Sequence, residues 1–154
     1  REKALWDEHK EIGYNFRMSN LLAAVGLAQL SKMDKILNAK KNVREFYGRC
    51  AEGRRLELLP KVEGENNWLT IMLLRNSRER DRLIKLFEAE NVETRPVWKP
   101  MHLQKVFKGC RVYGGNVSEN LFSRGVCLAS GAGLTEADFK RIAKVLDDFA
   151  AERK

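Results

Sequence analysis

A proline-free stretch with helical spacing of its apolar residues covers residues 19–52. Apolar side chains recur close to every third or fourth position from Leu22 to Cys50, and Ser19 is a suitable N-cap. A single helix of this length would extend ~50 Å at about 1.5 Å per residue. A compact body of 154 residues is only ~40 Å across. The helix is therefore expected either to break, near Asn38, or to run onto something outside this chain.

The rest of the chain alternates short strands with helices. Residues 56–61 and 67–74 are typical of strands, and the second is so apolar that both of its faces are expected to be covered. We expect the remaining elements in this order: a helix from an Asn76 cap to near Asn91, extended chain at 92–98, a short helix from Ser118, a strand at 126–129, and a last helix that begins at 135–138. This order predicts an α/β fold, in which a small mixed sheet carries helices on one face and the long helix leads into it. Residues 1–18 show no clean period and are expected to be a loop before a small domain at 19–154.

The composition excludes several classes of protein. With 44% hydrophobic and 32% charged residues, the chain is typical of one soluble domain. No apolar run approaches the ~20 residues of a membrane span. The chain begins with charged residues and has no apolar signal, so we expect a cytoplasmic protein with no membrane partner. The absence of an initial Met suggests that residues upstream have been cut away.

Three cysteines and a net charge of +8 also bear on function. Cys50, Cys110 and Cys127 are widely spaced and form no C-x-x-C or Cys/His pattern, so neither a disulfide framework nor a metal site is expected. A basic surplus is compatible with nucleic acid, with anionic substrates or with simple solubility. Acidic residues interrupt most of the basic groups, which favours solvated faces.

The first candidate site lies just before the long helix, at residues 13–20. Asn15 supplies an amide donor and Arg17 a guanidinium, beside a helix start whose free N–H groups and dipole favour a phosphate or carboxylate. Arg17 could hold such an anion through two hydrogen bonds. Helix starts of this kind are common. From physics alone, a capping loop with a surface arginine is the favoured interpretation.

The second candidate site is the segment 93–104, where two prolines stiffen an extended loop. Its His102 could hydrogen-bond a substrate hydroxyl or exchange a proton near neutral pH. The alternative is a strand end with ordinary surface polar groups. A third, Gly-rich segment at 126–135 fits neither of the common phosphate-binding patterns. For this segment a turn followed by a helix cap is favoured.

Together these segments resemble the DegT/DnrJ/EryC1/StrS aminotransferase family. The resemblance rests on the sequence EIGYNFRMSN at 11–20 and LLAAVGLAQL at 21–30, followed in order by residues 67–69, the loop at 94–104 and the turn at 127–135. It covers nearly the whole chain. Within the family, residues 93–107 look most like enzymes that aminate C4 of a UDP-linked 4-keto-6-deoxy-N-acetylhexosamine.

The resemblance implies the C-terminal domain of a fold-type-I, aspartate-aminotransferase-like homodimer that uses pyridoxal phosphate. The implied reaction is transamination of a nucleotide-linked ketosugar for sugar or cell-surface glycan biosynthesis, usually with glutamate as the amino donor. By the same resemblance, the Schiff-base lysine, the ring-stacking aromatic residue and the aspartate facing the pyridine nitrogen lie upstream of residue 1. This chain is then expected to hold no catalytic residue, and alone to be inactive and without bound cofactor.

Three residues match site positions of the family. Asn15 matches the asparagine that reaches the cofactor phosphate of the neighbouring subunit, while Arg17 and His102 match positions near the substrate. Phe16 occupies a position where the family often has tyrosine, and phenylalanine has no hydroxyl to make the contacts of that tyrosine. The rival hypothesis is a basic, non-catalytic binding or regulatory module, for example one that binds nucleic acid. The mixing of acids among the bases and the lack of a nucleic-acid motif argue against it.

Overall fold

The computed structural model describes Trp6, residues 8–9 and residues 11–152, so part of the expected loop at 1–18 lies outside the described residues. The described residues form the helices α1 (Asn20–Leu30), α2 (Met33–Arg54), α3 (Ser77–Ala89), α4 (Val117–Arg124) and α5 (Glu136–Ala151), the strands β1 (Glu57–Leu58), β2 (Ile71–Leu73), β3 (Arg95–Pro96) and β4 (Gly125–Cys127), and the 3-10 turns η1 (Met101–Leu103) and η2 (Lys105–Phe107). None of the described helices is both long enough and apolar enough to cross a membrane.

The strands form one small sheet in the order β1-β2-β4-β3. All three neighbouring pairs are antiparallel, so the expected mixed sheet is wrong in its pairing. The crossover through α3 does make β2 and β3 run in the same direction. They are not neighbours, however, because β4 lies between them and pairs with both. The strands are also shorter than the sequence pattern predicts.

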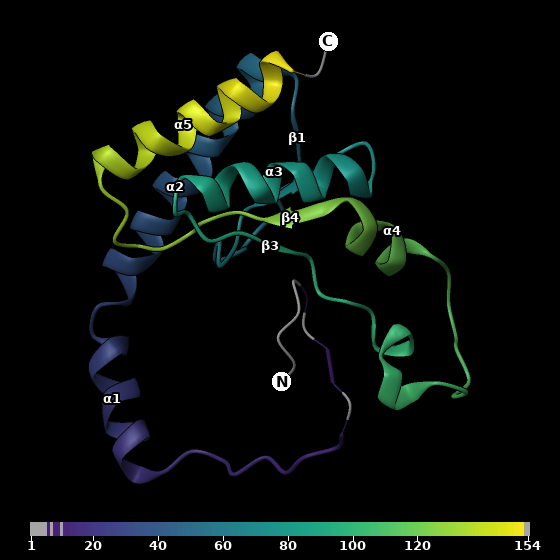
Figure 1. The fold of residues 1–154 in the computed structure, drawn as a ribbon. Helices are drawn as coiled ribbons and strands as arrows, with labels where there is room; N and C mark the ends of the chain where they lie inside the picture. The colour runs from purple at the N-terminus through teal and green to yellow at the C-terminus, as the bar shows by residue number, and fades with distance from the viewer. Residues whose placement is uncertain (1–5, 7, 10, 153–154) are drawn as a thin grey trace.

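Helices on one side of this sheet build the core. Figure 1 shows α2, α3 and α5 gathered above the strands, as expected for helices on one face. Apolar side chains at helical spacing supply the contacts between these layers. Fully buried side chains include Tyr47 of α2, Phe87 of α3 and Phe149 of α5, with Met72 and Val126 from the two central strands. Alternate residues of the strands thus face the helices.

The long leading helix is broken, at Ser31 and Lys32 rather than near Asn38. In a continuous helix the Ala28 carbonyl would accept the Lys32 N–H. Instead the Ser31 hydroxyl donates to the Ala28 carbonyl at 2.8 Å, and the Lys32 N–H turns to the Gln29 carbonyl at 3.0 Å. A serine side chain that competes for a helix carbonyl thereby ends α1 after a tight last turn.

Helix α1 buries none of its residues in the described structure. Figure 1 shows it extending away from the sheet, with the segment 11–18 crossing the lower part of the molecule to reach it. The exposed large apolar side chains of these two segments, which we call the α1 surface, are Ile12, Tyr14, Phe16, Met18, Leu21, Leu22, Val25, Leu27 and Leu30. So many exposed apolar side chains on two consecutive segments are typical of a region that another domain or subunit covers.

Candidate active site

The segment before α1 is shaped by a side-chain turn. The Asn15 Oδ1 atom accepts a hydrogen bond from the Arg17 backbone N–H at 2.8 Å. Arg17 itself has a φ of 64°, in the left-handed region that few non-glycine residues adopt. The Ser19 hydroxyl then accepts from the Leu22 N–H at 3.3 Å, which confirms the predicted N-cap. The amide and the guanidinium of the first candidate site therefore belong to one turn.

Both side chains of this turn are exposed. Among the described residues, no hydrogen bond uses the Asn15 amide nitrogen, and no ion pair uses the Arg17 guanidinium. The Asn15 Oδ1 is occupied by the backbone, so the Nδ2 atom is the part that can face a ligand. One amide donor and one guanidinium form a donor set that suits a phosphate or carboxylate.

The second candidate site is a loop closed by two 3-10 turns. The Leu103 N–H bonds the Pro100 carbonyl and the Gln104 N–H bonds the Met101 carbonyl, each at 3.0 Å. His102 lies on the first of these turns, and its Nε2 is 2.8 Å from Glu119 Oε1 on α4. The His102 side chain is 22% exposed. One ring nitrogen is therefore fixed by α4, and within the described part of the chain no hydrogen bond uses the other, which can face a ligand.

A buried carboxylate lies at the base of the same loop. Glu8 is only 5% exposed. Its Oε2 accepts from Lys99 Nζ at 2.7 Å and from Trp6 Nε1 at 3.2 Å, while its Oε1 accepts from the Lys105 backbone N–H at 3.3 Å. Hydrogen bonds from Lys99, then from Trp6, lower the pKa of Glu8 to about 2, so the carboxylate is ionised at neutral pH.

The Gly-rich third segment is a turn followed by a helix cap, as favoured above. The Thr135 hydroxyl accepts from the Asp138 N–H, and the Asp138 carboxylate accepts from the Thr135 N–H at 2.9 Å, which forms a capping box. The Thr135 hydroxyl also donates to Asp138 Oδ2 at 2.7 Å, and this bond, followed by the one from the Thr135 N–H, lowers the pKa of the Asp138 carboxyl. The turn is held from α2, because Lys40 Nζ donates to the Ser130 carbonyl at 2.7 Å. Nothing in this geometry calls for a phosphate.

A cavity of about 460 Å³ lies between this turn, β3 and α5. Its lining includes Arg95, Trp98, Ser130 and Arg141. None of the three residues that match the family's site positions lines it. The cavity is therefore a separate feature from the two loops that carry those residues.

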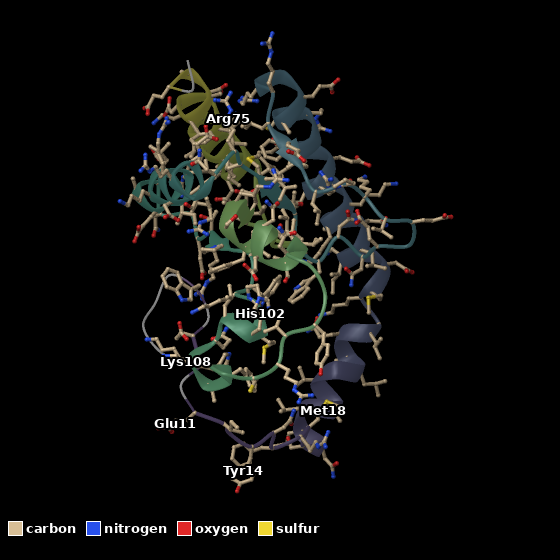
Figure 2. The ribbon with its side chains drawn as sticks, turned by 90° about the vertical axis from the view of Figure 1, so that its right-hand side faces the viewer. Glu11, Tyr14, Met18, Arg75, His102 and Lys108 are labelled. Carbon is tan, nitrogen blue, oxygen red and sulfur yellow. The ribbon has the colours of Figure 1, made fainter. Side chains whose placement is uncertain are left out.

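The two halves of the candidate site lie apart. In Figure 2, Tyr14 and Met18, which flank the Asn15 turn, lie at the lower end of the molecule, while His102 is placed higher, on the body of the domain. The structure joins Asn15 to Arg17 through a hydrogen bond, and among the described residues neither contacts His102. The candidate site of this chain therefore consists of two separate surfaces, one at the Asn15 turn and one at the His102 loop.

The sequence did not predict two acidic residues of this site. Glu8 lies in the segment expected to be a featureless loop, and Glu119 in a short surface helix. The available signal for Glu8 was the pairing of a tryptophan with an acid two residues later, which is too common to be specific. Glu119 lies in the first turn of a helix, where acidic residues are common because they interact favourably with the helix dipole. Its position therefore gave no sign of a role at the site.

Comparison with known proteins gives the family. The model of the DegT/DnrJ/EryC1/StrS aminotransferase family matches residues 1–147. The chain therefore belongs to this family, and the resemblance inferred from its motifs is confirmed. The Bacillus subtilis protein named "Putative pyridoxal phosphate-dependent aminotransferase EpsN" is 37% identical over 153 aligned residues, which cover 95% of this chain and 39% of EpsN.

Two further relatives agree. GDP-perosamine synthase of Vibrio cholerae is 32% identical over 152 aligned residues, covering 96% of this chain and 41% of the synthase. The crystal structure of a DegT DnrJ EryC1 StrS aminotransferase from Brucella abortus has a TM-score of 0.74 and 27% identity, covering 97% of this chain and 40% of that one. The expected α/β fold class is confirmed. The chain spans about 40% of the length of these relatives.

Proposed function

We propose that this chain is the C-terminal domain of a pyridoxal-phosphate-dependent aminotransferase that acts on a nucleotide-linked ketosugar. The observation that carries the proposal is the family match over residues 1–147, which includes both candidate loops. The name of the Vibrio cholerae relative, GDP-perosamine synthase, supports a nucleotide sugar as substrate. The resemblance of residues 93–107 to UDP-sugar enzymes favours a uridine nucleotide, whereas the name of the Vibrio cholerae relative favours guanosine.

The turn at Asn15 and Arg17 suits a phosphorylated cofactor. The Arg17 N–H uses one lone pair of the Asn15 Oδ1, and the Asn15 Nδ2 can donate to the oxygens of a phosphate dianion. We assign Asn15 to the cofactor phosphate of the neighbouring subunit and Arg17 to the substrate. Pyridoxal phosphate supplies the electron sink for amino-group transfer when it is bound. The Schiff-base lysine is assigned to the part of the relatives' length that this chain does not span.

His102 is assigned to the sugar-nucleotide side of the site. Glu119 holds its Nε2 at 2.8 Å and thereby orients the ring. A hydrogen bond from the other nitrogen to a hydroxyl of the sugar would help to place the keto carbon.

The remaining assignments follow the family pattern. We propose glutamate as amino donor, a homodimer as the working form, and a cytoplasmic enzyme of sugar or cell-surface glycan biosynthesis. The α1 surface supports a dimer or an interdomain contact, because its apolar side chains are exposed in this chain. A homodimer would also let Asn15 reach a site on the other subunit, because among the described residues Asn15 forms no hydrogen bond with the His102 loop.

The rival, a basic nucleic-acid-binding module, is less well supported. Several of the basic side chains form ion pairs within the domain: Arg54 pairs with Asp147, Arg124 with Glu57 and Lys144 with Glu90. Paired cations leave fewer charges to neutralise phosphates of a nucleic acid backbone. Binding to random DNA that weakens steeply with salt would favour the rival.

The test is a separation of the two half-reactions in the full-length protein. His102→Ala should leave the conversion of the cofactor by glutamate near normal, because the sugar takes no part in it. Amination of the ketosugar should slow by about ten- to a hundredfold, as expected for one lost polar contact. Single-turnover absorbance of the two cofactor forms measures each step. The matched control is His9→Ala, an exposed histidine that contacts Gln104 only through its backbone.

Two outcomes would count against the assignment of His102. If both half-reactions slow equally, the residue acts through stability, and if neither slows, it is not at the site. An absence of any transamination by the wild-type full-length protein would remove the proposed function itself.

A further inference from the structure

The loop that carries His102 is held at both of its ends by one carboxylate. Glu8 Oε2 accepts from the Lys99 side chain, where the loop begins, and Glu8 Oε1 accepts from the Lys105 backbone, where the loop ends. His102 lies between these two points. The side chains of Glu8 and Lys99 are 7% and 14% exposed, so this ion pair is largely removed from solvent.

A glutamine reinforces the same closure. Gln104 is 3% exposed, and its Nε2 donates to the Lys99 carbonyl at 3.4 Å. Its Oε1 accepts from the His9 backbone N–H at 3.1 Å. The amide of Gln104 thus connects the start of the loop to the residue that follows Glu8. Two neighbouring residues of the N-terminal segment therefore bind the loop through independent contacts.

Aromatic rings shield the ion pair. The Lys99 ammonium lies 5.8 Å from the centre of the Trp6 ring, and Trp6 packs edge-on against Phe122 of α4 at 6.3 Å. The indole N–H of Trp6 also donates to Glu8. Helix α4 carries Glu119, which is the hydrogen-bond partner of His102. The cluster around Glu8 therefore contacts both the loop that carries His102 and the helix that holds its ring. Exclusion of water strengthens each of these electrostatic contacts.

We propose that Glu8, with Lys99 as its counter-ion, is a positioning residue that holds the loop at 99–105 so that His102 faces the sugar nucleotide. This inference rests on the proposed function for the identity of the substrate. Glu8 touches no reacting group itself and acts through the loop.

The ion pair suits positioning better than stability. A buried pair contributes little net stability, since the loss of hydration offsets the attraction, but removal of one partner leaves an uncompensated charge. An apolar pair of similar volume could stabilise the same contact. It could not accept a hydrogen bond from the Lys105 N–H, and so could not fix the far end of the loop.

The experiment uses the full-length protein and two single variants, Glu8→Gln and Lys99→Met. Each should increase amide hydrogen exchange in residues 99–105 while residues 43–51 of the core stay protected. Each should also slow ketosugar amination about tenfold, mainly through KM, and leave the glutamate half-reaction near normal. Glu63→Gln, an exposed acid in the turn between β1 and β2, is the matched control and should change neither measurement.

A double variant, Glu8→Leu with Lys99→Met, separates position from stability. It removes both charges and should recover thermal stability that the single variants lose. If the sugar half-reaction stays slow after stability has returned, the positioning role is supported. If that half-reaction recovers together with stability, the proposal is overturned.

The remaining outcomes of these experiments test either the positioning role of Glu8 or the proposed function. Unchanged exchange in residues 99–105, or equal slowing of both half-reactions, overturns the positioning role of Glu8. Increased exchange with an unchanged KM overturns it too, because the loop would then move without consequence for the substrate. A wild-type protein that transaminates no sugar nucleotide refutes the proposed function. The exchange measurement still reports on the loop in that case, so the two failures are distinguishable.

Discussion

The oxygen and the nitrogen of the Asn15 side chain have different roles. Its oxygen forms the turn that places Arg17, and its nitrogen remains for a ligand. In the full-length enzyme, Asn15→Ala should weaken retention of pyridoxal phosphate, because a phosphate dianion loses a donor worth ~1.5–3 kcal/mol. That corresponds to about a ten- to hundredfold rise in Kd. Cofactor titration of the purified apoenzyme measures it.

The same variant tests whether Asn15 reaches the other subunit. In mixed dimers of wild-type and Asn15→Ala chains, the defect should appear in the site that faces the variant chain. A defect confined to the variant chain's own site would refute the assignment across the interface. Asn66→Ala is a matched control, since Asn66 also accepts a backbone hydrogen bond in an exposed turn and matches none of the three site positions of the family.

Residues whose partners are close in sequence were predictable. The caps Ser19, Asn76 and Thr135 are confirmed, because a cap depends on backbone groups two or three residues away. Glu8 was not predictable, because its partner Lys99 is 91 residues away and nothing in either local sequence marks the pair. A buried charge is recognisable only once the fold has brought its counter-ion to it.

At the scale of elements, the positions of helices and strands were easier to predict than the pairing between strands. The helices lie close to where their apolar spacing placed them, since a buried stripe is a property of one segment. The break in the leading helix was misplaced, because no proline or glycine marks it and a serine hydroxyl decides it. The antiparallel pairing was missed because strand neighbours depend on where β4 inserts, which is a property of the whole sheet.

Helix α1 should behave unlike the other long helices in the isolated chain. It buries no residue, and an unsupported helix of this length is marginal in water. We expect amide hydrogen exchange in residues 22–30 to be much faster than in residues 43–51 of α2, where Val43, Tyr47 and Cys50 are buried. Mass-spectrometric exchange on the 154-residue chain measures both segments at once.

The full-length protein provides a control for this exchange measurement. In the full-length protein, the α1 surface should be covered, and exchange in residues 22–30 should slow while that in residues 43–51 hardly changes. Equal protection of the two segments in the isolated chain would mean that α1 has a stabilising partner within the chain or through self-association, which sedimentation would distinguish.

At the scale of the whole molecule, the domain supplies donors and a substrate loop but is proposed to lack the Schiff-base lysine. The isolated chain should therefore neither bind pyridoxal phosphate tightly nor transaminate. Its many exposed lysines should react only weakly and without stoichiometry. Absorbance titration with the cofactor, followed by incubation with glutamate, measures both properties. A stoichiometric lysine adduct that turns over glutamate would contradict this prediction.

The backbone of Arg17 has a consequence for anyone who engineers this protein. A φ of 64° is a conformation that glycine adopts freely and that costs other residues about 1–2 kcal/mol. Arg17→Gly would relieve that cost and remove the guanidinium in the same step. A screen that rewards heat resistance alone would therefore accept this change readily. With Arg17 in its proposed substrate-binding role, the selected variants would be more stable but poorer with their sugar substrate.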